Sequence, residues 1–178
     1  FRFRSAGRPE GWIECRLVAE RDGDGRLLNA RGVLRDVTKG YLQERHIAHM
    51  ALHDALTNLP NRVLLEDRLR KATELAQRSG HRVAVCFIDL DHFKNINDAY
   101  GHKAGDALLQ TLAGVIKKVL REGDTLARWG GDEFVVLLPE LANADDVRPI
   151  AQALIDAMRQ SFEVEGVALS ATFSVGIA

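Results

Sequence analysis

The most unusual stretch of the chain is RWGGDEFVVLL, residues 128–138, in which two glycines precede two adjacent carboxylates and an apolar run. Asp132 and Glu133 stand directly before a pattern typical of a buried strand. An ionised carboxylate is costly to remove from water unless something compensates its charge. A second acidic motif, FIDLDHFKNIND at residues 87–98, places Asp89 at the end of another apolar run. The two motifs are therefore candidates for one site.

The chemistry expected of such a site is metal binding. Residues 83–88 have the pattern of a central strand, and its end is a place where side chains can leave the core for a cleft. If this strand lies beside the one that follows the glycines, Asp89 lies close to Asp132 and Glu133. Converging carboxylates repel one another unless a cation joins them. Hard oxygen ligands without cysteine or histidine suit Mg²⁺ or Mn²⁺, and two such ions can assist phosphoryl chemistry.

Each acid taken alone has a simpler explanation. Asp91 is suited to cap the helix expected after it, and Asp132 has the propensity for a hairpin turn. Both alternatives stay open. The occurrence of both acidic motifs on strands expected to be neighbours favours the metal site.

The glycines indicate where a ligand could approach the chain. Gly130 and Gly131 can adopt unusual backbone angles and leave room beside the main chain. In GHKAGD, residues 101–106, two further glycines precede a helix whose start can offer free N–H groups. Asn97 and Asp106 flank this turn, and an amide with a carboxylate can complement the edge of a guanine. Asp106 is equally well explained as a first-turn acid favoured by the helix dipole.

The helices and strands around these residues are expected in a definite order along the chain. The hydrophobic patterns predict a helix at 61–78, a central strand at 83–88 buried on both faces, a helix at 105–120, two strands joined by GGDE in a tight hairpin, a helix at 144–160 and a last strand at 167–175. The order from residue 81 is β-α-β-β-α-β. It predicts an α+β fold of the split βαβ type, an antiparallel sheet with helices on one face.

The N-terminal part has a different pattern. Residues 1–37 predict a β-hairpin with a half-buried first strand, WIECRLVAER, and with DGDG at 22–25 as its turn. A lone hairpin is only marginally stable, so its partner strands are expected upstream. Residues 38–53 predict a helical connector. The end of the hairpin, GVLRDVT, resembles the end of a PAS sensor domain.

Composition excludes several classes of function. The chain has 178 residues, enough for one ordinary domain and a fragment of another. Its 24 basic and 25 acidic residues give a net charge of −1, which argues against binding to nucleic acid polymers or anionic membranes. No apolar run approaches the ~20 residues of a membrane helix. Cys15 and Cys86 make no disulfide framework, which favours a reducing cytoplasm. The missing initial Met indicates a piece of a longer protein.

From about Asp54 to Ala178 the chain resembles a GGDEF domain, the diguanylate cyclase family. The matching pieces are DALTNLPNR (54–62), DLDHFKNIND (89–98), GHKAGD (101–106), RWGGDEF (128–134) and SVGIA (174–178). The resemblance implies a fold related to the palm of polymerases. It also implies an enzyme that joins two GTP molecules into cyclic di-GMP and releases pyrophosphate, with Mg²⁺ or Mn²⁺ and with one GTP held by each subunit of a homodimer.

The same resemblance implies roles for particular residues. The metal-binding and catalytic set is Asp89, the backbone carbonyl of Leu90, Asp132 and Glu133. Glu133 would contribute to metal binding or remove the proton of the attacking 3′-hydroxyl. The substrate-binding set comprises Phe93 and Lys94 along the phosphates, Asn97 and Asp106 at the guanine, and Gly130 and Gly131 against the nucleotide. The motif REGD, with Arg121 and Asp124, resembles the family's inhibitory product site, although RxxD also suits a solvated helix end.

Two functions follow from the resemblance. The first is a diguanylate cyclase controlled by the sensor part, residues 1–37, through the linker at 38–53. The second is a non-catalytic domain that binds GTP or cyclic di-GMP and regulates a larger signalling protein, one that could include a phosphodiesterase. The intact metal carboxylates favour the enzyme. Family members continue past SVGIA into a helix and hairpin that bind the triphosphate, so the GGDEF domain at 54–178 is expected to be truncated at its C-terminus.

Overall fold

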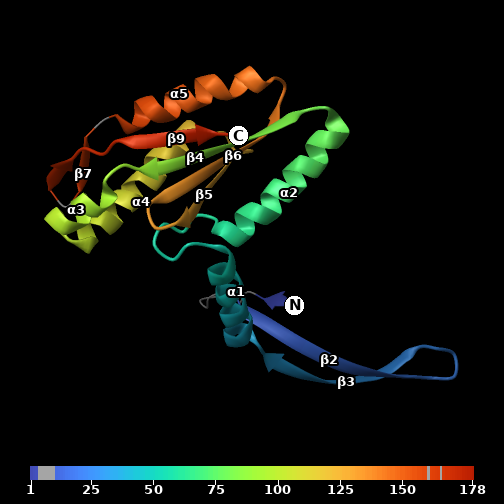
Figure 1. Ribbon diagram of the computed structural model, residues 1–178. Helices are drawn as coiled ribbons and strands as arrows, with labels where there is room; N and C mark the ends of the chain where they lie inside the picture. Colours follow the sequence, from blue (N-terminus) through green and yellow to red (C-terminus); the bar gives the residue numbers. More distant parts are fainter. Residues whose placement is uncertain (4–10, 160, 165) are drawn as a thin grey trace. The chain divides into compact units, whose positions relative to one another are not determined.

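The computed structural model describes residues 1–3, 11–159, 161–164 and 166–178, and the chain forms two compact units, residues 1–51 and 52–178 (Figure 1). Each unit has its own secondary structure and is described by itself. None of the helices in the described part of the chain is long and apolar enough to cross a membrane.

The first unit contains a long β-hairpin and a helix. Its elements are β1 (Arg2–Phe3), β2 (Gly11–Arg21), β3 (Leu27–Asp36) and α1 (Thr38–Leu52). The Asp22 side chain accepts hydrogen bonds from the backbone N–H groups of Asp24 and Arg26, which closes the turn between β2 and β3. The predicted hairpin, its turn and the helix after it are therefore confirmed.

The predicted half-burial of the first hairpin strand is wrong after Cys15, where β2 is exposed. Every residue of β3 is exposed, and Leu17 of β2 is 66% exposed. Alternating apolar residues form a half-buried strand only where another layer covers them, and no described residue covers this part of the hairpin.

The second unit is an antiparallel sheet of four strands in the order β5-β6-β4-β9. The strands of this sheet are β4 (Arg82–Leu90), β5 (Thr125–Gly130), β6 (Glu133–Leu141) and β9 (Phe173–Ile177). The helices are α2 (Arg62–Ser79), α3 (Phe93–Tyr100), α4 (His102–Val119) and α5 (Val147–Met158), the last preceded by a 3-10 turn, η1 (Ala144–Asp146). The α+β class and the split βαβ arrangement with its antiparallel sheet are confirmed.

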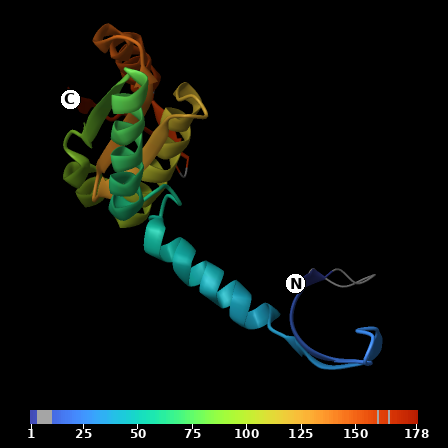
Figure 2. The same ribbon diagram turned by 90° about the vertical axis from the view of Figure 1, so that its right-hand side faces the viewer.

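Helices cover both faces of this sheet: α4 and α5 lie on one face, as predicted for the β-α-β-β-α-β unit, and α2, which precedes that unit, covers the other. On one face, α4 and α5 pack their buried leucines against alternate residues of β4 and β6, such as Ile88 and Phe134. On the other face, α2 packs Leu65 against Val135 and Leu137 (Figure 2). The sheet is therefore the middle of three layers.

The helix α2 begins and ends with two clear capping interactions. The Asn61 side chain accepts a hydrogen bond from the N–H of Leu64, and Gly80 adopts φ 74° and donates its N–H to the carbonyl of Ala76. Such caps satisfy backbone groups that a helix end leaves unpaired. The predicted helix at 61–78 is confirmed.

Two other predictions require correction. Residues 167–175 do not form one strand: β8 (Val167–Leu169) pairs with β7 (Phe162–Val164) in a separate two-stranded sheet, and β9 begins only at Phe173. The central strand β4 is not buried on both faces throughout, because Phe87 is 46% exposed. The helix predicted at 105–120 is confirmed as α4, which begins three residues earlier, at His102, and follows the separate helix α3.

Candidate active site

The GGDE motif forms a tight hairpin between β5 and β6, as predicted. A β-bulge falls between Arg128 and Gly130, and Gly130 pairs with Glu133 across the turn. Gly131 has φ +50°, a backbone conformation that favours glycine. The hairpin therefore leaves only Gly131 and Asp132 as turn residues.

The register of the sheet brings the two acidic motifs together. Asp89 at the end of β4 lies directly opposite Glu133 at the start of β6. Residues opposite each other in an antiparallel pair project from the same face, with Cβ atoms about 4.5–5.5 Å apart. Both side chains are exposed, and Asp132, half-buried, precedes Glu133 in the chain. Two carboxylates thus share one open corner of the sheet.

The donor set at this corner fits a hard divalent cation. Mg²⁺ is commonly held by one or two carboxylates, with waters and substrate phosphates as its other ligands. Asp89 and Glu133 supply two carboxylates, and Leu90 ends β4 beside them. Within the described ranges, no group of three histidine, cysteine or acidic side chains is gathered closely enough to hold a metal on its own. The protein therefore offers part of a coordination shell that a phosphate ligand would complete.

One arginine ties the hairpin turn to a distant part of the chain. Arg128 donates from Nε and Nη2 to the carbonyl of Gly131, at 3.0 and 2.6 Å. Its Nη1 donates to both carboxylate oxygens of Asp54, at 3.0 and 3.2 Å. The Thr57 side chain and backbone N–H also donate to Asp54. Arg128 thus holds the turn from the side opposite its open face.

The hydrogen bonds of Asp54 determine its ionisation. Partial burial raises the pKa of this carboxyl, but the bonds from Thr57 and Arg128 outweigh that effect and leave the pKa below its ordinary value. Asp54 is therefore a carboxylate at neutral pH and can hold Arg128 in place.

The second aspartate of the DLD motif has a structural role rather than the predicted capping role. Residue His92, with φ 60°, is the N-cap of α3 and no side chain caps that helix. Asp91 instead accepts a hydrogen bond from Ser174 Oγ at 2.8 Å, and its N–H donates to the carbonyl of Thr172 at 2.9 Å. Hydrogen bonds from Ser174 and then Thr172 lower the pKa of Asp91. This aspartate fastens the end of β4 to the start of β9.

The residues expected to recognise a base converge where α3 meets α4. A Cβ atom placed on Gly105 would lie 2.0 Å from Asn97 Oδ1 and 3.1 Å from Phe93 Cζ. Asn97 and Phe93 therefore lie directly over the backbone of Gly105, next to the exposed Asp106. Only a glycine at position 105 permits this approach.

The chain matches known proteins over this whole unit. The family described as "Diguanylate cyclase, GGDEF domain" matches residues 51–178. The chain belongs to the GGDEF family. A curated relative is the bifunctional diguanylate cyclase/cyclic di-GMP phosphodiesterase MucR of Pseudomonas aeruginosa, 46% identical over 134 residues, which are 75% of this chain and 19% of MucR. The chain thus spans about a fifth of that protein.

Solved GGDEF domains share this fold. The GGDEF domain of TpbB (YfiN) from Pseudomonas aeruginosa is 45% identical, with a TM-score of 0.68 over 70% of this chain and 73% of that one. The coiled coil and GGDEF domain of DgcB from Caulobacter crescentus, in complex with c-di-GMP, is 28% identical, with a TM-score of 0.71 over 79% of this chain and 75% of that one. These likenesses support the fold assigned above.

The RxxD motif of this GGDEF domain lies in a compact turn between α4 and β5. Asp124 accepts hydrogen bonds from the backbone N–H of Arg121 at 2.9 Å and from its Nη2 at 3.3 Å. The Asp124 side chain is 2% exposed, whereas that of Arg121 is 62% exposed. Asp124 thus shapes the turn, and Arg121 presents its guanidinium to solvent.

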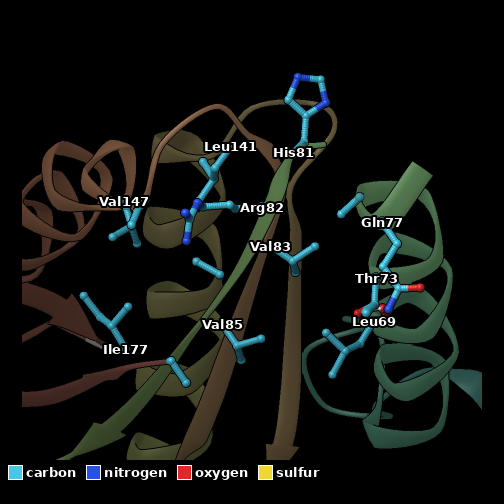
Figure 3. A pocket seen from close by; sticks show the side chains of 14 residues that line it. Leu69, Thr73, Gln77, His81, Arg82, Val83, Val85, Leu141, Val147 and Ile177 are labelled. Carbon is cyan, nitrogen blue, oxygen red and sulfur yellow. Dashed lines mark hydrogen bonds between the residues drawn. The ribbon is translucent and has the colours of Figure 1, made fainter. Parts of the chain in front are cut away.

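A cavity of about 640 Å³ lies elsewhere in this GGDEF domain (Figure 3). Leu69 and Thr73 of α2 and Val83 and Val85 of β4 are among the residues that line it. Val85, the nearest of these residues to the carboxylate corner, is four residues from Asp89 along β4, or about 13 Å in an extended strand. The cavity is therefore separate from the carboxylate corner.

The prediction from sequence missed three residues of this region. They are Arg128, which bonds to the hairpin turn, Asp54, which bonds to Arg128, and Ser174, which bonds to the DLD motif. Asp54 and Arg128 stood at the edges of the recognised motifs. Their pairing spans 74 positions, so only a sheet topology could have revealed it.

Proposed function

We propose that this chain carries the catalytic domain of a diguanylate cyclase, which converts two GTP molecules into cyclic di-GMP and two pyrophosphates. The observation that carries the proposal is the placement of Asp89 opposite Glu133 beside the GGDE turn. The GGDEF family match and the diguanylate cyclase MucR among the relatives support it.

The carboxylate corner would hold Mg²⁺ or Mn²⁺ through Asp89, Asp132, Glu133 and the backbone carbonyl of Leu90. A bound divalent cation supplies Lewis-acid stabilisation of charge on the α-phosphate and favours ionisation of the attacking hydroxyl. The two turn-flanking acids differ in exposure: Asp132 is half-buried and Glu133 is exposed. Glu133 is therefore the better placed to exchange protons with the substrate.

The chemical step is an in-line displacement. The 3′-oxygen of one GTP forms a bond to the α-phosphorus of the other, the bond to pyrophosphate breaks, and Glu133 accepts the hydroxyl proton. The same step with the roles exchanged closes the ring. Because each GTP must be both nucleophile and electrophile, two sites must face each other, and a homodimer provides this arrangement.

Substrate recognition is assigned to the neighbourhood of α3 and α4. Asn97 and Asp106 would complement the guanine edge, and the contact of Asn97 with Gly105 fixes the amide in place for this role. Phe93 and Lys94 would lie along the phosphates. Gly130 and Gly131 have no atom within 4 Å of an added Cβ, so their face of the turn is open to a nucleotide.

Regulation is also proposed. Cyclic di-GMP would inhibit by binding at Arg121, whose exposed guanidinium can grip a phosphate or guanine edge. A sensor part upstream of α1 would control the enzyme through that helix.

The proposal is tested by incubating the protein with GTP and Mg²⁺ and measuring cyclic di-GMP and pyrophosphate. Two pyrophosphates should appear for each cyclic di-GMP. Asp132→Ala should abolish turnover and leave the thermal unfolding transition in place. A folded protein that binds GTP without forming either product would refute the catalytic assignment and favour a regulatory GGDEF domain.

A further inference from the structure

A side-chain stack connects the start of α2 to the centre of the sheet. The guanidinium carbon of Arg62 lies 4.4 Å from the centroid of the Trp129 ring, within cation–π distance. Trp129 in turn meets Phe87 edge to face, with ring centroids 6.0 Å apart. This stack, formed by Arg62, Trp129 and Phe87, draws on residues that the site described above does not use.

The stack lies on the same sheet face as the proposed metal ligands. Phe87 and Asp89 are two residues apart in β4 and therefore project from one face, about 7 Å apart along the strand. Trp129 packs with Val135, which stands two residues beyond Glu133 in β6 and shares its face. The stack thus borders the carboxylate corner one residue pair further into the sheet.

The space beside the stack is open. Because of the β-bulge, Gly130 pairs with Glu133 and belongs to the carboxylate face directly after Trp129. A Cβ atom on Gly130 would meet no atom within 4 Å. A ligand held by Asp89 and Glu133 can therefore extend over Gly130 toward Trp129 and the guanidinium stacked on it.

Fold stability explains little of this arrangement. The Arg62 Nε donates to Glu66 at 2.8 Å, an i,i+4 ion pair with both side chains more than half exposed. Such exposed pairs contribute little to the free energy of unfolding, and they do not require a tryptophan beneath the cation. With Nε bonded to Glu66, the two Nη groups remain as the donors available to a ligand, in the planar geometry that binds phosphate.

We propose that Arg62, held on Trp129, binds the β- and γ-phosphates of GTP and so stabilises the charge on the departing pyrophosphate. The inference rests on the proposed function, since it places the nucleotide at Asp89 and Glu133. It adds the guanidinium of Arg62, in the first turn of α2, to the groups that would bind the nucleotide, alongside the carboxylates Asp89 and Glu133. Trp129 acts as a positioning residue, because it orients the guanidinium and does not contact the phosphates.

The test compares the binding of GTP and GMP to the purified 178-residue protein by titration calorimetry in Mg²⁺. Arg62→Ala should weaken GTP binding about 10- to 100-fold, as expected for losing hydrogen bonds from a charged donor, and should leave GMP binding within about twofold. Arg62→Lys keeps the charge but loses the planar fork, so an intermediate loss is expected. Trp129→Leu should act in the same direction as Arg62→Ala.

The matched control is Arg70→Ala, an arginine of the same helix that is 60% exposed and also ion-paired. It should change neither affinity. Equal affinity of wild type and Arg62→Ala for GTP would overturn the inference. An equal loss of affinity for GTP and GMP in Arg62→Ala would also overturn it. So would a wild-type protein that binds GTP no more tightly than GMP. Failure of the proposed function gives a different result: GTP binds with its preference over GMP intact, yet no cyclic di-GMP forms.

Discussion

One side chain, Arg128, holds the GGDE turn in place. Arg128→Ala removes two hydrogen bonds to the Gly131 carbonyl and the ion pair to Asp54. The side chains of Arg128 and Asp54 are only 13% and 23% exposed, so solvent replaces these bonds poorly. Hydrogen bonds to charged groups contribute about 1.5–3 kcal/mol each, but these bonds share one side chain and their losses do not add. We expect unfolding free energy to fall by about 2–3 kcal/mol.

The assays are urea unfolding for the free energy, thermal unfolding for the Tm, and a measurement of turnover. A loss of this size corresponds to a decrease in Tm of roughly 6–12 °C for a domain of this length. Turnover of the residual folded protein should fall at least about tenfold, since small displacements of catalytic groups are costly. Stability within about 0.5 kcal/mol of wild type, with unchanged turnover, would refute the assigned role of Arg128. Arg70→Ala on the surface of α2 is the control.

The same ion pair predicts a pH dependence. Because the pKa of Asp54 is lowered in the folded state, its contribution is fully present above its unfolded pKa, about 3.9, and is lost as the pH falls through the lower folded pKa. The stability difference between wild type and Asp54→Asn should therefore be largest at neutral pH and shrink below about pH 4. A difference that does not change between pH 7 and pH 3 would contradict this.

Three further substitutions test other parts of the site. Gly105→Ala should reduce the preference for GTP over ATP in binding, because its methyl group displaces Asn97; an unchanged preference would remove Asn97 from base recognition. Ser174→Ala should lower unfolding free energy by about 1 kcal/mol through loss of its hydrogen bond to Asp91, with no change in the KM for GTP. Gly130→Ala should leave the unfolding transition in place, since its Cβ meets nothing within 4 Å, yet reduce turnover; full activity would show that no nucleotide packs there.

The carboxylate corner could be predicted from sequence because two local signals fix it. The GGDE turn sets the register of β5 and β6, and the apolar run of β4 ends at Asp89. Once these strands neighbour each other, Asp89 must lie near Glu133, as the pairing confirms. Register follows from hydrophobic pattern and turn geometry, both of which a sequence displays.

Other features could not be read from pattern. The run at 167–175 alternates as one strand would, and only the pairing of β8 with β7 shows the interruption. Amphipathic helices show that they have a buried face but not which side of a sheet they cover, so the position of α2 was missed. The bonds of Arg128 and the stacking of Arg62 on Trp129 connect segments far apart in sequence, and charge pairing leaves no periodic signal.

A double-mutant cycle measures whether Asp89 and Glu133 form one metal site. Mn²⁺ affinity is measured by electron paramagnetic resonance, in the presence of a non-reactive GTP analogue, for Asp89→Asn, Glu133→Gln and the double variant. We expect each single change to weaken Mn²⁺ binding at least about tenfold and the double variant to be scarcely weaker than either, since both changes remove the same site. Wild-type affinity in the single variants, or losses that simply add, would contradict this expectation.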